Sequence, residues 1–524
     1  MTPPHNPKIW GPPDRPLELV ARNVSTRYMA ILVDGVLGLL LLPFNVAHLG
    51  PAAYGLWALT ASITWFFGVL DLGYGGALVK FIAQYRAWRD RSSLNEILST
   101  IGLVFTAIGA LCLLVTAVLA WQVDTLFNID PGQAETARSV LLITGTYLSV
   151  RFAFAIFGSV VYGFQRYYLN NAVSIGISLT IAAVNVAVLN AGHGLVALVA
   201  CTTAVRLLSL ALFMWNAYRV YPGLSVRPSL FRVARLREVT GFSVYMLILD
   251  WSAKLNYSSD ALVIGAMLDT TAVAMWTVGQ RLAQFTQHLT NQLNDALFPN
   301  VVDSDAAQRE DRLQAILMKG TKLSLGLAAP LCLALIVLAD PLIASWVGSG
   351  FSASVLPAQI MLAVVLIRVS TASANLILRG AGQHKLLAMT NATAAVVNVG
   401  LSVALVRPLG LLGVALGTLI PIAVSTVGIL FPAACRRVNL PITRPLMHAI
   451  WPAMWPAIVM VALLRLAAPV RPDGLHGLAL HCAAGGLLYV GLFVLFAMDS
   501  DERRLYWARL RSVVVRQRRA PVAG

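Results

Sequence analysis

The sequence predicts an all-α, polytopic membrane protein with about fourteen transmembrane helices. Its 524 residues are 58% hydrophobic and only 12% charged. Apolar runs of about twenty residues, the length that spans roughly 30 Å of hydrocarbon, recur along nearly the whole chain. An internal repeat relates the first six runs to the next six, and two further runs follow them. We therefore expect two six-helix lobes and two C-terminal helices.

The ends of the apolar runs place the predicted spans and domains. The spans are 28–47, 54–79, 98–122, 139–161, 170–190, 194–215, 240–266, 272–297, 317–339, 357–378, 386–406, 410–433, 448–469 and 476–498. The expected domains are a disordered cytoplasmic tail (1–22), an N-lobe of helices 1–6 (23–220), a cytoplasmic linker (221–239), a C-lobe of helices 7–12 (240–435), helices 13–14 (436–498) and a basic cytoplasmic tail (499–524).

The distribution of Lys and Arg predicts the orientation of these spans. With the N-terminus in the cytoplasm, and with Lys319, Lys322 and Arg465 near span ends counted with the adjoining loops, cytoplasmic segments hold 30 of the 39 Lys and Arg residues, outer loops hold four, and five lie inside spans. Such an asymmetry is typical of a membrane protein with both termini in the cytoplasm. It explains the net charge of +16 without a nucleic-acid partner, and the basic C-terminal tail suits contact with anionic membrane lipids.

The internal repeat has an offset of 216 to 219 residues. The segment HLGPAAYGLW (48–57) precedes the second span, and MLDTTAVAMW (267–276) precedes the eighth. Their alignment pairs Leu49 with Leu268, Ala53 with Ala272 and Trp57 with Trp276. Because each repeat holds an even number of spans, both repeats enter the membrane from the same side. This predicts a pseudo-two-fold axis along the membrane normal and a transport site between the lobes.

Three segments carry a resemblance to a known family. They are LGPAAYGLWALTASITWFFGVLDLGYGGALVKFIAQY (49–85), WVGSGFSASVLPAQIMLAVVLIRVS (346–370) and LRGAGQHKLLAMTNATAAVVNVGLSVALVRPLGLLGVALGTLIP (378–421). These segments resemble Wzx-type oligosaccharide flippases of the multidrug/oligosaccharidyl-lipid/polysaccharide exporter superfamily. The resemblance implies a bacterial inner-membrane protein that uses alternating access. It implies a repeat-unit oligosaccharide on undecaprenyl pyrophosphate as cargo, and polymerase or glycosyltransferase machinery as partners.

Apart from Lys319, Lys322 and Arg465, which lie within five residues of a span end, ten charged residues lie within the predicted spans, where each costs about 2.5 to 3.5 kcal/mol on insertion scales unless it has a partner or a wet cavity. The cations are Arg151, Arg206, Lys254, Arg281 and Arg368, and the acids are Asp34, Asp71, Asp250, Asp260 and Asp295. The equal numbers favour pairing for some of them. Arg151 and Arg368 lie twelve residues before Gly163 and Gly380, at equivalent repeat positions. Such a pair either anchors each lobe or binds phosphate.

The acids have two interpretations each. Asp250 lies four residues before Lys254, so the two share a helix face and either form a structural ion pair or couple transport to protonation. Asp71 lies in a DLG run near the cytoplasmic end of the second predicted span. This position favours a contact at the end of the helix. We therefore take Asp250, Asp34, Asp260 and Asp71 as candidates for coupling or for structural ion pairs.

The stretch VGQRLAQFTQHLTNQLNDALFP (278–299) is the most polar helix candidate. Its amides Gln280, Gln284, Gln287, Asn291 and Asn294 advance by four, three, four and three residues, which places them on one helix face, with Arg281 and His288 on its flank. Either a buried network of hydrogen bonds between helices or a hydrated cavity would supply partners for these amides. We favour the cavity. Amides suit sugar hydroxyls, and Arg281 and Lys254 suit a pyrophosphate. The predicted substrate-binding residues are Lys254, Arg281, Gln280, Gln284, Gln287, His288, Asn291, Arg151 and Arg368.

The sequence offers no support for an enzyme. It has neither a GxxxxGK[ST] phosphate loop nor an HExxH motif, and its five cysteines lack metal-ligand spacing, so we expect no cofactor and no metal. The favoured function is translocation of a lipid-linked oligosaccharide. The alternatives are a cation-coupled drug exporter or a lipid II flippase of the same superfamily, and a non-transporting scaffold for polysaccharide synthesis.

Overall fold

The structure is a computed structural model whose described part consists almost entirely of helices. Its backbone is described for residues 16–295, 298–467, 474–499 and 503–504. Its side chains are described for the same residues except 16–17, 69, 242–258, 289, 291–295 and 298–299. Eleven of the described helices are long and apolar enough to cross a membrane. The predicted fold class, an all-α polytopic membrane protein, is therefore confirmed.

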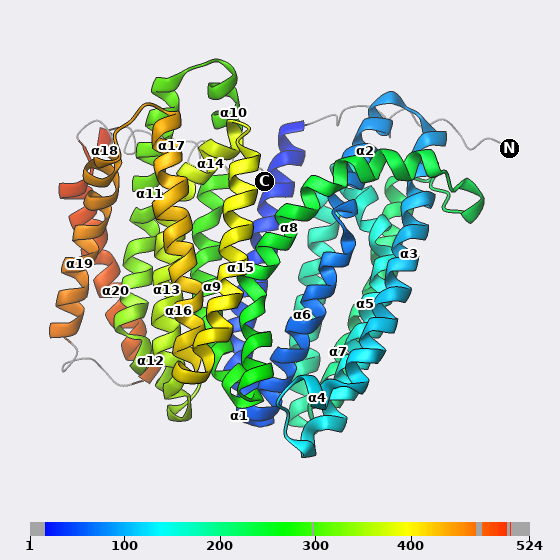
Figure 1. Ribbon diagram of the computed structural model, residues 1–524, viewed down its shortest axis with the longest axis horizontal. Helices are drawn as coiled ribbons and strands as arrows, with labels where there is room; N and C mark the ends of the chain where they lie inside the picture. Colours follow the sequence, from blue (N-terminus) through cyan, green and yellow to red (C-terminus); the bar gives the residue numbers. More distant parts are fainter. Residues whose placement is uncertain (1–15, 296–297, 468–473, 500–502, 505–524) are drawn as a thin grey trace, which may run out of the picture. The chain divides into compact units, whose positions relative to one another are not determined.

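Figure 1 shows the order of the helices along the chain. In the first half they are α1 (Pro16–Phe67), η2 (Gly68–Asp71), α2 (Tyr74–Trp88), α3 (Arg91–Trp121), α4 (Val123–Leu126), η3 (Pro131–Gln133), α5 (Ala134–Gly163), α6 (Tyr167–Asn190), α7 (Leu195–Val220) and η4 (Pro228–Leu230). In the second half they are α8 (Val233–Met267), α9 (Thr270–Asp295), α10 (Phe298–Ala306), α11 (Glu310–Val337), α12 (Ala339–Trp346), η5 (Ser349–Ser354), α13 (Val355–Ser370), α14 (Ala372–Gly380), α15 (His384–Leu409), α16 (Leu411–Ala423), η6 (Val424–Leu430), α17 (Phe431–Arg437), α18 (Thr443–Pro445), η7 (Leu446–Ile450), α19 (Trp451–Leu466), α20 (Gly474–Leu492) and η9 (Phe493–Ala497).

The chain divides into two compact units. Unit 1 comprises Met1–Arg281 and Asn391–Thr418, and unit 2 comprises Leu282–Thr390 and Leu419–Gly524. The boundaries fall inside α9, α15 and α16, so each of these helices has residues in both units. The predicted lobes, 23–220 and 240–435, remain a prediction.

Helix α1 contains the first predicted span and the start of the second. It bends at Gly50, whose φ of 78° and ψ of 162° suit only glycine, and Pro51 starts the second arm. The first arm begins at Pro16, so residues 16–22 of the predicted tail are helical.

The second predicted span, 54–79, is interrupted in the structure. The second arm of α1 ends at Phe67, and Leu72 and Gly73 then adopt left-handed φ values of 53° and 74° before α2 begins. Two consecutive left-handed residues cannot continue a right-handed helix. Asp71 caps the new helix, because its Oδ1 accepts a hydrogen bond of 3.1 Å from the backbone N–H of Gly75.

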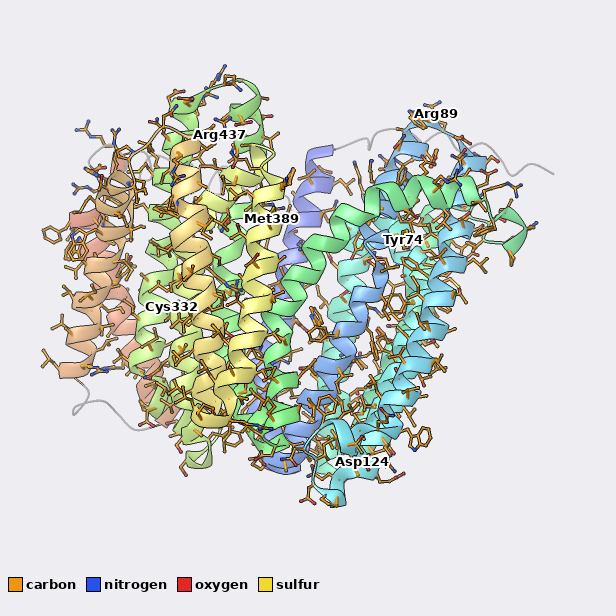
Figure 2. All side chains as sticks on the ribbon, in the orientation of Figure 1. Tyr74, Arg89, Asp124, Cys332, Met389 and Arg437 are labelled. Carbon is orange, nitrogen blue, oxygen red and sulfur yellow. The ribbon has the colours of Figure 1, made fainter. Side chains whose placement is uncertain are left out.

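Unit 1 joins its helices in a continuous series. Helix α3 packs against α5, α5 against α7, and α7 against α6, which also contacts α1 (Figure 1). Asn23 ties α1 to the start of α6, because its Nδ2 donates to Gln165 O at 2.8 Å and its Oδ1 accepts from Tyr168 N at 3.0 Å. Tyr74 of α2, labelled in Figure 2, hydrogen-bonds Thr240 of α8 at 3.0 Å.

An arginine holds the start of α8 against α2 and α3. Arg235 Nε lies 3.2 Å from Glu96 Oε2, and its Nη1 lies 2.7 Å from the hydroxyl of Tyr85 and 3.2 Å from Glu238 Oε2. Burial and the hydrogen bond to Glu238 raise the pKa of Tyr85 to about 12. The phenol therefore remains a protonated donor to Glu238 at physiological pH.

We expect Arg235→Ala to destabilise unit 1. It leaves Glu96 and Glu238 without their cation, and hydrogen bonds to charged groups contribute about 1.5 to 3 kcal/mol. The thermal unfolding midpoint of the detergent-purified protein measures the effect. Arg232→Ala is the matched control, because the Arg232 guanidinium bonds only the nearby carbonyl oxygens of Ser229 and Phe231 among the described residues. An equal fall of the unfolding midpoint in both variants would contradict the stabilising role of Arg235.

Unit 2 is built around α11, which contacts α13, α14, α19 and α20. The C-terminal pair α19–α20 packs on it through a buried apolar cluster, and the hydroxyl of Tyr489 donates to Ala453 O at 3.1 Å. Cys332, labelled in Figure 2, lies fully buried within α11. Arg437 of α17 forms an ion pair with Asp305 of α10 (Figure 2).

Candidate functional site

The predicted amide stripe lies along α9, between a buried face and an exposed flank. Arg281 and His288 are exposed, whereas Gln280, Gln284 and Gln287 are half-buried. Successive residues turn by about 100° around a helix, so the amides occupy the border between the two faces. The side chain of Asn291 lies outside the described residues, although its backbone is helical. The substrate-binding role of the stripe remains a prediction.

The opposite face of α9 explains this orientation. Ala283, which is 2% exposed, packs in unit 2 with Ala328 and Cys332 of α11 and with Val365 and Val369 of α13. The nearby Thr286 and Thr290 are fully buried, and their hydroxyls bond carbonyl oxygens one turn earlier in the helix. Small apolar residues and self-satisfied threonines thus hold this face against the core and turn the long polar side chains away from it.

Arg281 contacts both arms of α1. Its guanidinium lies beside the hydroxyl of Tyr54, a residue of the second arm that is only 6% exposed. Its Nη1 also lies 3.9 Å from the position that a Cβ would take at Gly38 of the first arm. The absence of a side chain at Gly38 leaves room beside the guanidinium. The neighbouring Tyr54 fixes the direction of the Arg281 side chain, which remains exposed.

Asp34 lies one turn from Gly38 on α1, on the same side of that helix. Its side chain is exposed, and its Oδ1 accepts a hydrogen bond of 3.4 Å from the hydroxyl of Ser178 on α6. An acid and a cation thus lie along one side of the first arm of α1.

Asp260 lies in a buried polar cluster of unit 1. It is 1% exposed, and the hydroxyl of Thr418 on α16 lies 3.3 Å from both of its carboxyl oxygens. Asn398 of α15 donates to the same hydroxyl at 3.0 Å, and its Oδ1 lies 3.5 Å from the hydroxyl of Ser259. The cluster therefore connects α8, α15 and α16 through oxygen-rich side chains around one carboxyl group.

The other predicted charges lie elsewhere. Arg151 is exposed on α5 of unit 1, and Arg368 is half-buried in the last turn of α13 in unit 2. Asp71 caps α2, which is the helix-end contact favoured for it. The side chains of Lys254 and Asp250 lie outside the described residues, so their pairing remains a prediction.

Tyr54, Asn398 and Thr418 were not among the predicted site residues. Tyr54 lies in HLGPAAYGLW, a segment of the internal repeat, and Thr418 lies in the segment 378–421 that carries the family resemblance. Asn398 is a lone amide in an apolar run, which carries a desolvation cost that only a partner removes. These signals mark the residues as unusual, but they do not identify the partners.

The chain matches a known protein family and resembles two curated proteins. A family model described as "Polysaccharide biosynthesis protein" matches residues 48–356, which is more than half of the chain. The chain is 24% identical to "Uncharacterized membrane protein EpsK" of Bacillus subtilis over 403 residues, covering 75% of this chain and 79% of that protein. It is 21% identical to "Probable flippase AglR" of Haloferax volcanii over 493 residues, covering 92% and 97% of the two chains.

Solved structures share the fold. The structure of "Lipid II flippase MurJ, inward closed conformation" superposes with a TM-score of 0.72 at 14% identity, covering 90% of this chain and 98% of that chain. A multidrug resistance MATE family transporter in an inward-facing conformation superposes with a TM-score of 0.60 at 16% identity, covering 78% and 94%.

Proposed function

This chain belongs to the polysaccharide biosynthesis protein family, and we propose that it is a flippase that moves a polyprenyl-pyrophosphate-linked oligosaccharide across the bacterial inner membrane by alternating access. The predicted resemblance to Wzx-type flippases is confirmed at the level of the family, which makes the protein a transporter rather than an enzyme. In the proposal the carrier is undecaprenyl pyrophosphate, the glycan serves surface or exopolysaccharide synthesis, and polymerase or glycosyltransferase machinery is the partner. Both chain termini lie in the cytoplasm.

The placement of Arg281 carries this proposal. A guanidinium offers five donors in a fork that matches phosphate oxygens. The Tyr54 hydroxyl lies beside the Arg281 guanidinium, and Gly38 leaves space beside it. On the same helix, the amides of Gln284 and Gln287 supply donors and acceptors for sugar hydroxyls. In the proposal, Arg281 holds the pyrophosphate and the half-buried amides hold the first sugars.

Asp260 is the proposed coupling residue. A buried carboxylate is costly unless it is protonated or has a cation beside it. The oxygen atoms of Asp260, Thr418 and Asn398 suit a proton or a small hard cation. Binding or release of this proton or cation would alter the hydrogen bonds that connect α8, α15 and α16. Ion binding would thereby be linked to the positions of these helices. Asp34 is a second candidate acid, because it lies on the side of α1 that Arg281 approaches.

Replacing the stripe with leucine tests transport against the scaffold alternative. We expect the double variant Gln284→Leu and Gln287→Leu to lose glycan export in a deletion strain, because leucine offers no hydrogen bond to a sugar. Phe285→Leu on the same helix is the control and should export normally. Surface glycan and membrane protein levels are measured together. Normal export by the double variant at normal protein level would favour the scaffold.

A further inference from the structure

Trp65, on the second arm of α1, is an exposed tryptophan in the middle of a predicted span. It is 60% exposed, and it lies eleven residues from the start and fourteen from the end of the span 54–79. Tryptophan usually gathers at the membrane–water interface. Among the described residues, the four other exposed tryptophans obey this rule, since each lies near a span end or in a predicted cytoplasmic segment: Trp88, Trp121, Trp215 and Trp451. Trp65 departs from it.

The indole of Trp65 is poorly suited to hydrocarbon at this depth. Its N–H has no hydrogen-bond partner in the part of the chain that the structure describes. A polar group without a partner is costly in lipid, whereas water or a sugar hydroxyl would satisfy it. The exposure of Trp65 therefore favours a surface that meets a polar ligand.

Trp65 ends a stripe along one side of the second arm of α1. Tyr54, Ala58, Ala61 and Trp65 advance by four, three and four residues, which is the spacing of one helix face. Exposure rises along this stripe, because Tyr54 is buried, Ala58 is half-buried, and Ala61 and Trp65 are exposed. The two alanines carry only methyl groups, so the helix surface is low between the two aromatic rings.

The rest of this arm is packed within unit 1. Leu56 and Leu59 have no exposed surface, and the Leu59 side chain packs against Gly265 of α8. A Cβ at Gly55 would overlap the carbonyl oxygen of Thr270, so only glycine permits so close an approach of this arm to the start of α9. These contacts fix the rotation of the arm, and the stripe faces away from the core. A side chain held on a fixed helix is pre-organised for binding.

The stripe begins at the proposed pyrophosphate site. Its first residue, Tyr54, has its hydroxyl beside the guanidinium of Arg281, and both residues belong to unit 1 with Trp65. Trp65 lies eleven residues further along the helix, which is about 16 Å at 1.5 Å per residue. This distance is too long for a contact with a phosphate at Arg281. It suits the glycan that the pyrophosphate carries.

The internal repeat gives Trp65 a counterpart among the proposed sugar-binding residues. At the offset of 219 residues, Ala61 aligns with Gln280 and Trp65 with Gln284. Equivalent positions thus carry amides in one repeat and an aromatic ring in the other. Amides bond the hydroxyl groups of a sugar, and an aromatic ring packs against the C–H groups on the face of a sugar ring. Both kinds of side chain are suited to a glycan.

We propose that Trp65 is a stacking platform for a pyranose ring of the cargo. The flat indole packs against the C–H face of the sugar, while the hydroxyl groups at the edge of the ring stay free for water and amides. The proposal rests on the proposed function and adds a preference to it. The platform favours uncharged pyranoses that present several C–H groups on one face.

Trp65→Leu tests the platform against a contact with lipid. Leucine suits lipid but offers no flat aromatic face, so we expect glycan export to fall about tenfold, the size of one lost aromatic contact. Trp65→Phe keeps an aromatic ring and should retain most of the export. Trp215→Leu is the matched control, because Trp215 is 59% exposed at a span end. Surface glycan is measured in a deletion strain at limiting expression, relative to membrane protein detected by immunoblot.

The result for Arg281 separates this proposal from the proposed function. Normal export by Trp65→Leu, or an equal loss in Trp65→Leu and Trp215→Leu, would overturn the platform. If Arg281→Glu nevertheless abolished export, the proposed function would stand. Normal export by both Trp65→Leu and Arg281→Glu would contradict the platform and the proposed function together.

Photo-cross-linking provides a second test, which measures binding rather than transport. Trp65 is replaced by the photoreactive residue p-benzoylphenylalanine, and cells that make the glycan are irradiated. The protein cross-linked at position 65 should carry glycan, detected by periodate staining of the purified band. The same replacement of Trp215 should give phospholipid adducts without glycan. Phospholipid adducts alone at position 65 would show that this position faces lipid, and would overturn the platform.

Discussion

Replacing Arg281 by Glu is expected to abolish glycan export while the protein reaches the membrane at its normal level. The variant sets a carboxylate where the proposed site holds the pyrophosphate of the cargo. Two unit charges about 4 Å apart interact by about 4 kcal/mol at an effective dielectric constant of 20, and each 1.4 kcal/mol corresponds to a factor of ten in affinity. Reversing the sign of a favourable contact therefore lowers affinity by at least roughly a thousandfold.

The conservative variant Arg281→Lys separates charge from geometry. Lysine keeps the positive charge but loses the planar fork that lies beside Tyr54. We expect partial export from Arg281→Lys, and a smaller loss from Tyr54→Phe, which removes only the hydroxyl. Surface glycan in a deletion strain is measured against membrane protein detected by immunoblot. Normal export by Arg281→Glu would exclude Arg281 from the cargo site.

Asp260→Asn is expected to stop transport with little loss of folded protein. Asparagine keeps the shape of the side chain and can still bond Thr418, but it can neither release a proton nor balance a cation. Any residual transport by the reconstituted variant should not depend on external pH or on the small cation, because the proposed coupling group is gone. Wild-type transport with an unchanged ion dependence would contradict the assignment of Asp260.

Asp260→Ala tests how much the Asp260 side chain contributes to the stability of the folded protein. It removes the carboxyl acceptor of the buried Thr418 hydroxyl, which keeps Asn398 and the Val414 carbonyl as partners, and a lost hydrogen bond contributes about 0.5 to 1.5 kcal/mol. We expect a lower unfolding midpoint for Asp260→Ala and a midpoint near wild type for Asp260→Asn. Thr418→Val, which removes one hydroxyl at constant volume, should weaken ion dependence without reversing it. Equal destabilisation of all three variants would indicate a purely structural cluster.

Local chemistry explains why much of the fold is predictable. Apolar runs place the helices because an unsatisfied backbone is too costly in lipid, and Lys and Arg predict their orientation. The break at 68–73 was missed because the apolar run continues through it. In the structure α1 ends at Phe67, a 3₁₀ turn follows over Gly68–Asp71, and the left-handed Leu72 and Gly73 separate this turn from α2.

The sequence by itself determined the membrane class, the family, and the presence of a polar face on α9 with Arg281 on its flank, because each depends on composition or on a spacing of a few residues. Only the tertiary structure decided that Arg281 meets Tyr54, that Asp260 meets Thr418, and that Gly55 meets the start of α9. These pairs are separated by more than one hundred residues. No local periodicity encodes such a pairing; it arises when helices pack closely enough for each buried polar group to find a partner.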